Sequence, residues 1–264
     1  VRFGHRMEDD LEMLELDDDR EFVAHLRVDA EGGLYGESGE RDHVVDYQQW
    51  ALVAEVDVTV DSSVLPEGQT LAFERFTHEG PAALLPIDIA QKRYSLVWCA
   101  PKSVTDKRIA LKEETFFREL RQVFGRRVRV QSVGPRLAFP LGMNWRDRLV
   151  QGRRVAIGNA AQILHPVAGQ GLNLGLRDAA TLVRSLDPVW IDQADRIQNA
   201  LREFEDSRRI DRQGVVKATD LRVKGFSNTN PVVGLGRQAV LNVMEFTPLV
   251  RKQFAQAMLF GLAS

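Results

Sequence analysis

VAIGNAAQILHPVAGQGLNLGLRD, residues 155–178, is the stretch that decides the fold of this chain. Its first three residues are apolar and typical of a buried strand, and Gly158 follows them directly. Gly169 and Gly171 then open a segment whose apolar residues recur at helical spacing until Asp187-Pro188 stops it. Glycines allow close backbone approach, and a helix N-terminus offers unpaired N–H donors and a positive dipole end. The stretch therefore predicts a strand–turn–helix unit that binds a polar, partly anionic cofactor.

The same stretch carries a resemblance to a known family. From Gly158 onward it reads GNAAQ-x-x-HP-x-AGQGLNLG, which resembles the second flavin motif of the FAD-dependent aromatic hydroxylases. That superfamily, which is para-hydroxybenzoate-hydroxylase-like, mostly reads GDAAH here, and the GNAAQ form is similar to its ubiquinone-biosynthesis branch. Three further runs resemble the middle domain of that branch: AFERFT at 72–77, LLP at 84–86 and SLVW at 95–98. PVVG at 231–234 extends the match. Two long motifs in the right order are far more specific than one glycine-rich turn.

The resemblance implies an α+β chain with interleaved domains, a truncated FAD/NAD(P)-binding monooxygenase fold. We expect residues 1–40 and 136–186 to form an α/β remnant of the FAD-binding domain, 41–135 an antiparallel β substrate domain, and 187–264 a C-terminal helical region. Such flavoproteins open with a βαβ unit that carries G-x-G-x-x-G, and this motif does not occur here. Because the sequence starts at Val1 rather than Met, we expect a chain that lacks this unit; a natural short paralogue is the alternative.

Hydrophobic periodicity predicts the individual elements of the middle region. Apolar residues between Leu52 and Val60 alternate with polar ones, as in a half-buried strand. Further strands are expected at 70–76, 82–87, 93–99 and 127–133, and paired strands with an acidic turn at 17–19 are expected within 1–35. One amphipathic helix interrupts the strands, with Gly125 as its C-cap and an apolar face made of Phe116, Leu120, Val123 and Phe124.

Ten residues are candidate cofactor-binding positions because they match the family's motifs. The resemblance places Gly158 and Asn159 near the FAD phosphate and ribityl chain, and Pro166 on the flavin face. It also implies that backbone N–H groups reach the pyrimidine edge of the flavin from Gly169, Gln170, Gly171, Leu172 and Asn173. Glu31 and Gly32 occupy the place of a DG motif that touches the flavin in the family, although a plain Gly-Gly turn accounts for them equally well. For the 264 residues alone, we expect that half a site does not suffice to bind FAD.

The resemblance also implies the reaction. FAD reduced by NAD(P)H reacts with O2 to give a flavin C4a-hydroperoxide, which hydroxylates the aromatic ring of a polyprenyl-phenol intermediate in ubiquinone biosynthesis. Since the flavin carries the chemistry, no catalytic side chain is assigned. Two alternatives stay open: a sibling flavin hydroxylase of different ring specificity, and a non-catalytic module that assembles with other ubiquinone-biosynthesis proteins.

Composition excludes several other classes. The 264 residues carry a formal charge of −2, which gives no reason to expect a nucleic-acid partner. The five histidines lack metal-ligand spacing, so no metal site is predicted. Cys99 is the single cysteine and lies in the apolar run YSLVWCA, which indicates a core position in a reducing compartment. His165 is the one histidine inside a motif, and a structural role is expected for it.

Two C-terminal segments have distinct compositions. REFEDSRRIDR at 202–212 is a mixed charge run, which we interpret as a solvated helix face. Residues 232–263 are strongly apolar, which is typical of a packed helical pair or of a surface for peripheral contact with a membrane or a partner. We expect a cytoplasmic protein, with membrane association at the inner membrane as the more specific hypothesis.

Overall fold

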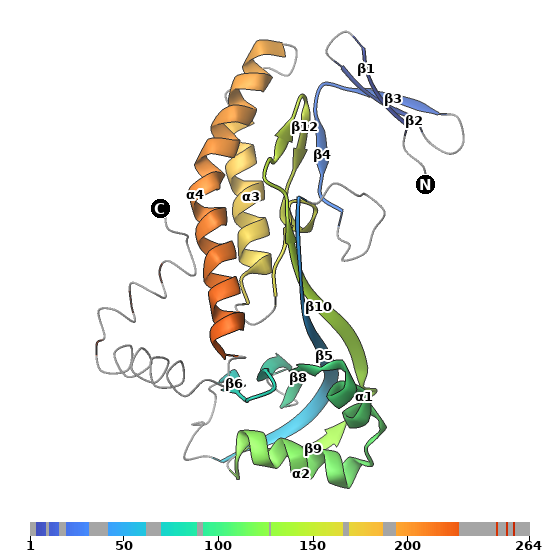
Figure 1. Cartoon of the computed structure of the whole chain (residues 1–264), viewed down its shortest axis with the longest axis vertical. Helices are drawn as coiled ribbons and strands as arrows, with labels where there is room; N and C mark the ends of the chain where they lie inside the picture. Colours follow the sequence, from blue (N-terminus) through green and yellow to red (C-terminus); the bar gives the residue numbers. More distant parts are fainter. Residues whose placement is uncertain are drawn as a thin grey trace. The chain divides into compact units, whose positions relative to one another are not determined.

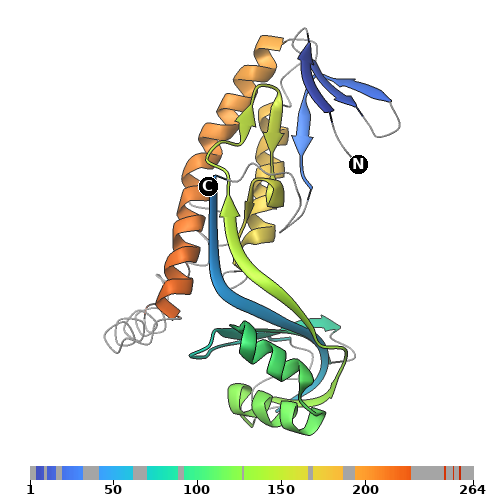
Figure 2. The same ribbon diagram turned by 45° about the vertical axis from the view of Figure 1, so that its right-hand side comes forward.

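A computed structural model describes residues 4–8, 11–15, 20–31, 42–61, 70–88, 92–126, 128–165, 169–186 and 194–226, together with 247, 252 and 256 (Figures 1 and 2). The chain forms two compact units, each assembled from separate segments. Unit 1 comprises Val1–Val45, Met143–Leu221 and Leu241–Ser264, and unit 2 comprises Asp46–Gly142 and Arg222–Val240. The mixture of helices with a largely antiparallel sheet confirms the α+β class. The functional limits predicted for the domains stay a prediction.

Unit 1 contains two small sheets. The first is an antiparallel meander of β1 (Gly4–Glu8), β2 (Leu11–Glu15) and β3 (Glu21–Ala24). The second has the order β11-β12-β4, built from β4 (Arg27–Asp29), β11 (Val150–Gln151) and β12 (Arg154–Ala156). β4 and β12 run parallel, and Nε of Arg154 donates to the carboxylate of Asp29, 125 residues away in the sequence. The expected turn at 17–19 lies outside the described residues.

The same unit continues after β12 into the motif stretch. A 3-10 turn, η1 (Gly158–Ala160), leads to β13 (Gln162–Ile163), and α3 (Gly171–Leu186) follows. The long helix α4 (Ala194–Phe226) lies beside α3 in both ribbon views. Phe204, Leu201 and Ile197 of α4 pack with Leu182 and Val155 into one apolar core. The predicted stop at Asp187-Pro188 lies just beyond the last described residue of α3.

Unit 2 is organised around one sheet and two helices. Its strands follow the order β10-β5-β8-β7-β6, with β9 paired to β5. The last residues of β10, Asn144 and Trp145, belong to unit 1 and pair there with β13. Their bounds are β5 (His43–Val60), β6 (Phe73–Phe76), β7 (Pro81–Asp88), β8 (Arg93–Pro101), β9 (Val128–Val133) and β10 (Leu137–Trp145). The helices are α1 (Lys102–Ala110) and α2 (Glu113–Phe124).

The core of unit 2 follows the predicted periodicity. In β5, Leu52, Ala54, Val56 and Val58 are buried, while Glu55 and Thr59 are exposed. Phe116, Leu120 and Phe124 of α2 pack with them, and Gly125 caps the helix with φ +81°. The four further strands are confirmed, although β6 begins three residues later than expected. Cys99 is buried as predicted, and burial raises the pKa of its thiol to about 12.

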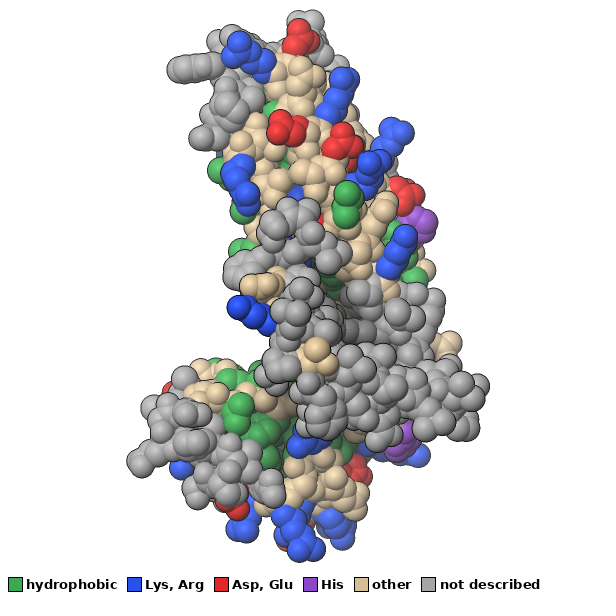
Figure 3. Space-filling model, turned by 90° about the vertical axis from the view of Figure 1, so that its left-hand side faces the viewer, with side chains coloured by type: hydrophobic (Ala, Val, Ile, Leu, Met, Phe, Trp, Pro, Cys, Tyr) green, Lys and Arg blue, Asp and Glu red, His purple; other side chains and the backbone are tan. Residues whose placement is uncertain are grey.

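One prediction about α4 holds only in part. In the charge run 202–212, Arg202, Glu203, Asp206 and Arg209 are exposed as on a solvated face, but Arg208, Asp211 and Arg212 are buried. Figure 3 shows the side of the molecule on which α4 lies, with other Lys, Arg, Asp and Glu side chains exposed to solvent. The run therefore has some side chains in solvent and others in the interior. The residues that bind its buried side chains are part of the candidate site.

Within the described residues, no helix is both long enough and apolar enough to cross a membrane. The apolar segment 232–263 lies outside the described residues except for positions 247, 252 and 256. Its two interpretations, a packed helical pair or a contact surface, stay predictions.

Gly80→Ala is expected to destabilise the chain. Gly80 has φ +151°, and an added Cβ would lie 2.7 Å from the backbone oxygen of Cys99, which cannot move without disturbing β8. Strain of this kind costs roughly 1–3 kcal/mol. Chemical denaturation measures the loss. Gly134→Ala is the matched control, since its Cβ would make an ordinary 3.5 Å contact with the Glu55 oxygen. Equal stability of the two variants would contradict the expectation.

Candidate functional site

The parallel pair β4 and β12 positions the candidate site in unit 1. Asp29 and Ala156 are register partners at the ends of these strands, and the N–H of Ile157 donates to the Asp29 backbone oxygen at 3.0 Å. Ligands of open α/β sheets bind beyond the carboxyl ends of parallel strands. Gly158 follows β12 and the exposed Glu31 follows β4, so the structure brings these two predicted positions to the same edge. Gly32 lies outside the described residues.

η1 packs against α3 through two glycines. Gly158 has φ +59°, a left-handed conformation that favours glycine. A Cβ on Gly175 of α3 would lie only 3.2 Å from the Gly158 Cα. The close approach therefore favours glycine at position 175, whereas a Cβ on Gly158 would make an ordinary 3.9 Å contact with Gly175 and glycine is favoured there by its φ. Asn159, the next predicted position, is exposed on the turn that results.

The start of α3 presents backbone with open space beside it. Gly169 is exposed and has φ +59°, and an added Cβ at Gly169 or Gly171 would meet none of the described residues within 4 Å. The first helical hydrogen bond runs from the N–H of Leu174 to the Gln170 oxygen at 2.9 Å. The N–H groups of Gly171, Leu172 and Asn173 come before it, at the helix end where donors lack intrahelical partners.

Two further observations fit a flat polar ligand at this helix start. Leu172 is 74% exposed, so its backbone is not covered by a buried side chain. Gln170 is buried, and its Oε1 has no hydrogen-bond partner among the described residues. Open space, free N–H groups and an unsatisfied polar atom together fit the pyrimidine edge of a flavin, as the sequence predicts for residues 169–173. The roles of the individual residues stay predictions.

His165 is described by the structure, whereas the next residue, Pro166, lies outside the described residues. The imidazole is buried, and burial lowers its pKa to about 4. It is therefore uncharged at neutral pH, which agrees with the structural role expected for it.

A buried carboxylate anchors the turn from behind. Asp178 is 0% exposed. Its Oδ2 accepts hydrogen bonds from the Gln162 amide at 2.7 Å and from the Gly158 N–H at 3.2 Å. Its Oδ1 accepts from Nε of Arg208 at 2.8 Å. One side chain of α3 thus fixes η1, β13 and α4 in place.

The network extends along α4. Arg208 also donates to Asp211 at 2.7 Å, and Asp211 accepts a second hydrogen bond from Arg177 of α3 at 3.0 Å. Arg212 donates through Nε to the Gln162 oxygen at 2.6 Å and through Nη2 to the Arg146 backbone oxygen at 2.9 Å. The carboxylates and guanidinium groups of α3 and α4 thereby hold the two helices against the motif stretch.

Sequence reasoning missed this network. Gln162 is the last letter of the GNAAQ motif, yet it was not assigned a role, and Asp178 closes the quoted stretch without one. The signal for the others was the spacing of Arg208, Asp211 and Arg212, which places charges on one helical face. Among the described residues, no group of His, Cys, Asp and Glu side chains could hold a metal ion.

Asp178→Asn is expected to destabilise unit 1 strongly. Removal of the charge leaves the buried Arg208 guanidinium only partly compensated by Asp211. Breaking one side of a buried ion pair costs about 3–5 kcal/mol. Thermal or chemical denaturation measures the change. Asp106→Asn is the control, because Asp106 makes an exposed pair with Lys102 and exposed pairs contribute about 0–1 kcal/mol. A similar small loss for both variants would contradict the anchoring role.

His165 predicts a specific dependence of stability on pH. The folded state binds its proton only near pH 4, whereas the unfolded chain binds it near the ordinary value of 6.5. The unfolded state therefore holds more protons between these values, and stability falls as the pH is lowered through this window. The slope for one group is at most about 1.4 kcal/mol per pH unit. His165→Gln should flatten the curve of unfolding free energy by that amount between pH 6.5 and 4. Parallel curves for the two proteins would refute the expectation.

The chain is similar to known proteins along most of its length. The model of an FAD binding domain matches residues 41–219. The chain is 34% identical over 249 residues to the ubiquinone hydroxylase UbiL of Rhodospirillum rubrum, covering 92% of this chain and 56% of that protein. It is 28% identical over 254 residues to 3-demethoxyubiquinol 3-hydroxylase of Escherichia coli, covering 93% of this chain and 62% of that protein. The chain therefore spans little more than half the length of these relatives.

Solved structures agree on the fold. PqsL, a probable FAD-dependent monooxygenase from Pseudomonas aeruginosa, is similar with a TM-score of 0.68 at 21% identity, over 86% of this chain and 64% of that one. HpxO from Klebsiella pneumoniae, solved with FAD and uric acid, is similar with a TM-score of 0.65 at 17% identity, over 98% of this chain and 65% of that one. These likenesses confirm the fold expected from the sequence. Since the matched domain covers well over half of the residues, the chain belongs to the FAD-binding-domain family.

Proposed function

We propose that this chain is part of an FAD-dependent aromatic-ring hydroxylase that acts on a polyprenyl-phenol intermediate in ubiquinone biosynthesis, with NAD(P)H and O2 as co-substrates. The observation that carries the proposal is the open start of α3, where Gly169 and Gly171 leave space beside N–H groups that precede the first described helical hydrogen bond. Similarity to the ubiquinone hydroxylase of Rhodospirillum rubrum supports the substrate class. Because the chain spans 56% of that relative, the activity is proposed for the whole protein.

The side chains and backbone of this chain bind and orient, while bound FAD supplies the redox chemistry. The N–H groups at the start of α3 donate toward the pyrimidine edge of the ring system. The positive end of the helix dipole stabilises negative charge that develops there. Asn159 offers both a donor and an acceptor to hydroxyl groups without adding a negative charge near phosphate. The exposed Glu31, beyond the end of β4, faces the same edge of the small sheet.

Rigid support of this edge is the second contribution. A binding constellation acts well only when its supporting residues are themselves fixed by packing and hydrogen bonds. Asp178 fixes the Gly158 N–H and the Gln162 amide, and Gln162 in turn accepts from Arg212. The GNAAQ turn is therefore held from the side opposite to the ligand. Contact with other ubiquinone-biosynthesis proteins and with the inner membrane belongs to the same proposal.

Gly171→Val tests the location of the cofactor. The Cβ of valine enters the open space beside Gly171 without meeting another described residue, and valine has no lower helix propensity than glycine. FAD affinity should fall by about tenfold or more, roughly 1.4 kcal/mol, while the melting temperature stays within experimental error. Flavin absorption and fluorescence titration measure binding, first on the 264-residue chain and then on the chain joined to the G-x-G-x-x-G unit of a relative. Ala180→Val, at an exposed position farther along α3, is the control.

Turnover distinguishes the proposed function from its alternatives. The joined protein should oxidise NAD(P)H in the presence of O2 and a short-chain prenylphenol, and release a hydroxylated product that mass spectrometry identifies. Hydroxylation at another ring position, or of another aromatic only, would replace the proposal with a sibling hydroxylase. Bound FAD without turnover on any phenol, or no FAD binding at all, would favour the assembly module.

A further inference from the structure

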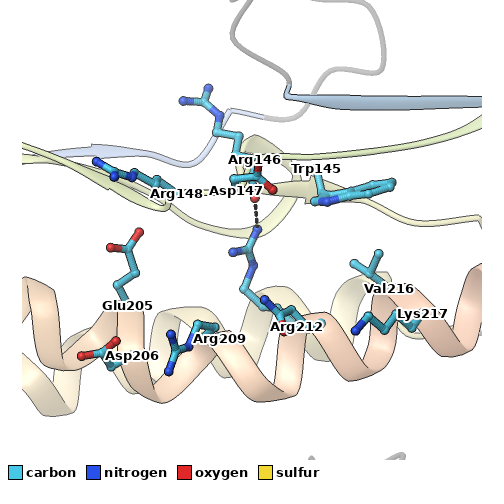
Figure 4. Close-up of a pocket in the computed structure, with 11 residues that line it drawn as sticks. Trp145, Arg146, Asp147, Arg148, Glu205, Asp206, Arg209, Arg212, Val216 and Lys217 are labelled. Carbon is cyan, nitrogen blue, oxygen red and sulfur yellow. Dashed lines mark hydrogen bonds between the residues drawn. The ribbon is translucent and has the colours of Figure 1, made fainter.

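A second polar site lies in unit 1, on the side of α4 that faces the segment between β10 and β11. It is a pocket of about 460 Å³ between residues 145–148 and the α4 residues 205–217 (Figure 4). This volume lies within the range of small-molecule sites, about 300–1,000 Å³. None of the residues predicted to bind FAD lines it.

The pocket walls are held together by hydrogen bonds at several points. Oε1 of Glu205 accepts from the Leu149 N–H at 2.6 Å and from the Val150 N–H at 3.1 Å. The Arg212 guanidinium donates to the Arg146 backbone oxygen, which Figure 4 shows as a dashed line across the pocket. Both contacts tie α4 to the segment between the strands. The cavity is therefore formed by fixed backbone rather than by a chance gap between side chains.

Among the charged side chains around the pocket, some have hydrogen-bond partners within the protein and others do not. Asp147 forms a hydrogen bond with His43 at 2.8 Å, and the carboxylate of Glu205 accepts the two backbone N–H groups. By contrast, three exposed cations that line the pocket have no hydrogen-bond or ion-pair partner among the described residues: Arg148, Arg209 and Lys217. Asp206 is the one lining acid without a described partner. The unengaged charges therefore favour an anion.

Arg212 adds a buried positive charge to the pocket floor. It is 7% exposed, and the described acceptors of its hydrogen bonds are neutral oxygens of Gln162 and Arg146. It forms no ion pair with a carboxylate among the described residues. Burial lowers the pKa of Arg212 and Arg208 adds to the effect, while the carboxylates of Asp178, Glu205 and Asp147 oppose it. A ligand anion nearby would offset part of the cost of burying this charge.

We propose that this pocket binds the phosphate group of an organic phosphate, with Arg148, Arg209 and Lys217 as its cationic contacts. Several cations around one cavity match a dianionic, multidentate oxyanion better than a single carboxylate. Trp145 and Val216 supply apolar wall, so the pocket also accepts the non-phosphate part of the ligand. The same chemistry is offered by a soluble nucleotide and by a phospholipid headgroup with a terminal phosphate.

Calorimetric titration of the full 264-residue chain with adenosine monophosphate tests the soluble source. Co-sedimentation with phosphatidylcholine vesicles, with and without phosphatidic acid, tests the headgroup. Binding in at least one arm should be saturable, weaken with added salt, and fall by about tenfold or more in the double variant Arg148→Gln, Arg209→Gln. Asp206→Asn should tighten it, because this change removes the lining acid that has no described partner. FAD is absent from both arms, so the result does not depend on the proposed hydroxylase function.

Arg202→Gln is the matched control. Arg202 is an exposed arginine of the same helix and does not line the pocket, so its loss should leave binding unchanged. Circular dichroism establishes that each variant is folded before titration. The arm that responds identifies the source of the phosphate. Absence of saturable binding in both arms, or equal loss in Arg202→Gln and the double variant, would overturn the proposal.

Discussion

The ion pair between Asp178 and Arg208 is the interaction on which the rest of unit 1 depends. Both groups are buried, and an isolated charge in either position would be costly. The carboxylate also accepts from the Gln162 amide and the Gly158 N–H, so one buried anion joins α3, α4, η1 and β13. With its hydrogen-bonding capacity largely used, this carboxylate serves as a hub rather than as a reactive group.

The glycine pair makes that arrangement geometrically feasible. The Gly158 N–H reaches Asp178 because η1 approaches α3 closely; Gly175 leaves room for that approach, and Gly158 adopts the left-handed φ of the turn. The buried Asp178 carboxylate and the two glycines thus act together to fix η1 against α3. Their joint result is a rigid turn at the edge that the sequence predicts to contact the flavin.

Periodicity predicted unit 2 well because burial there follows a simple rule. One face of β5 and one face of α2 point into a single apolar core, so alternation at Leu52–Val58 and helical spacing at Phe116–Phe124 report burial directly. The same reasoning held only in part for 202–212. A charged residue on α4 is buried or exposed according to whether another segment supplies a partner, and the partners of Arg208 and Arg212 lie 30 and 50 residues away in the sequence.

The sequence by itself determined the local elements, the glycine positions and the resemblance that implied FAD. These properties depend on neighbouring residues, backbone torsions and a contiguous motif, all of which can be recognised from residues close together in the sequence. Only the tertiary structure decided that Glu31 and Gly158 share one edge, that Gln162 links Asp178 to Arg212, and that a cationic pocket forms on α4. Those outcomes require long-range pairing, because the energy of a buried charge is set by the groups that folding brings beside it.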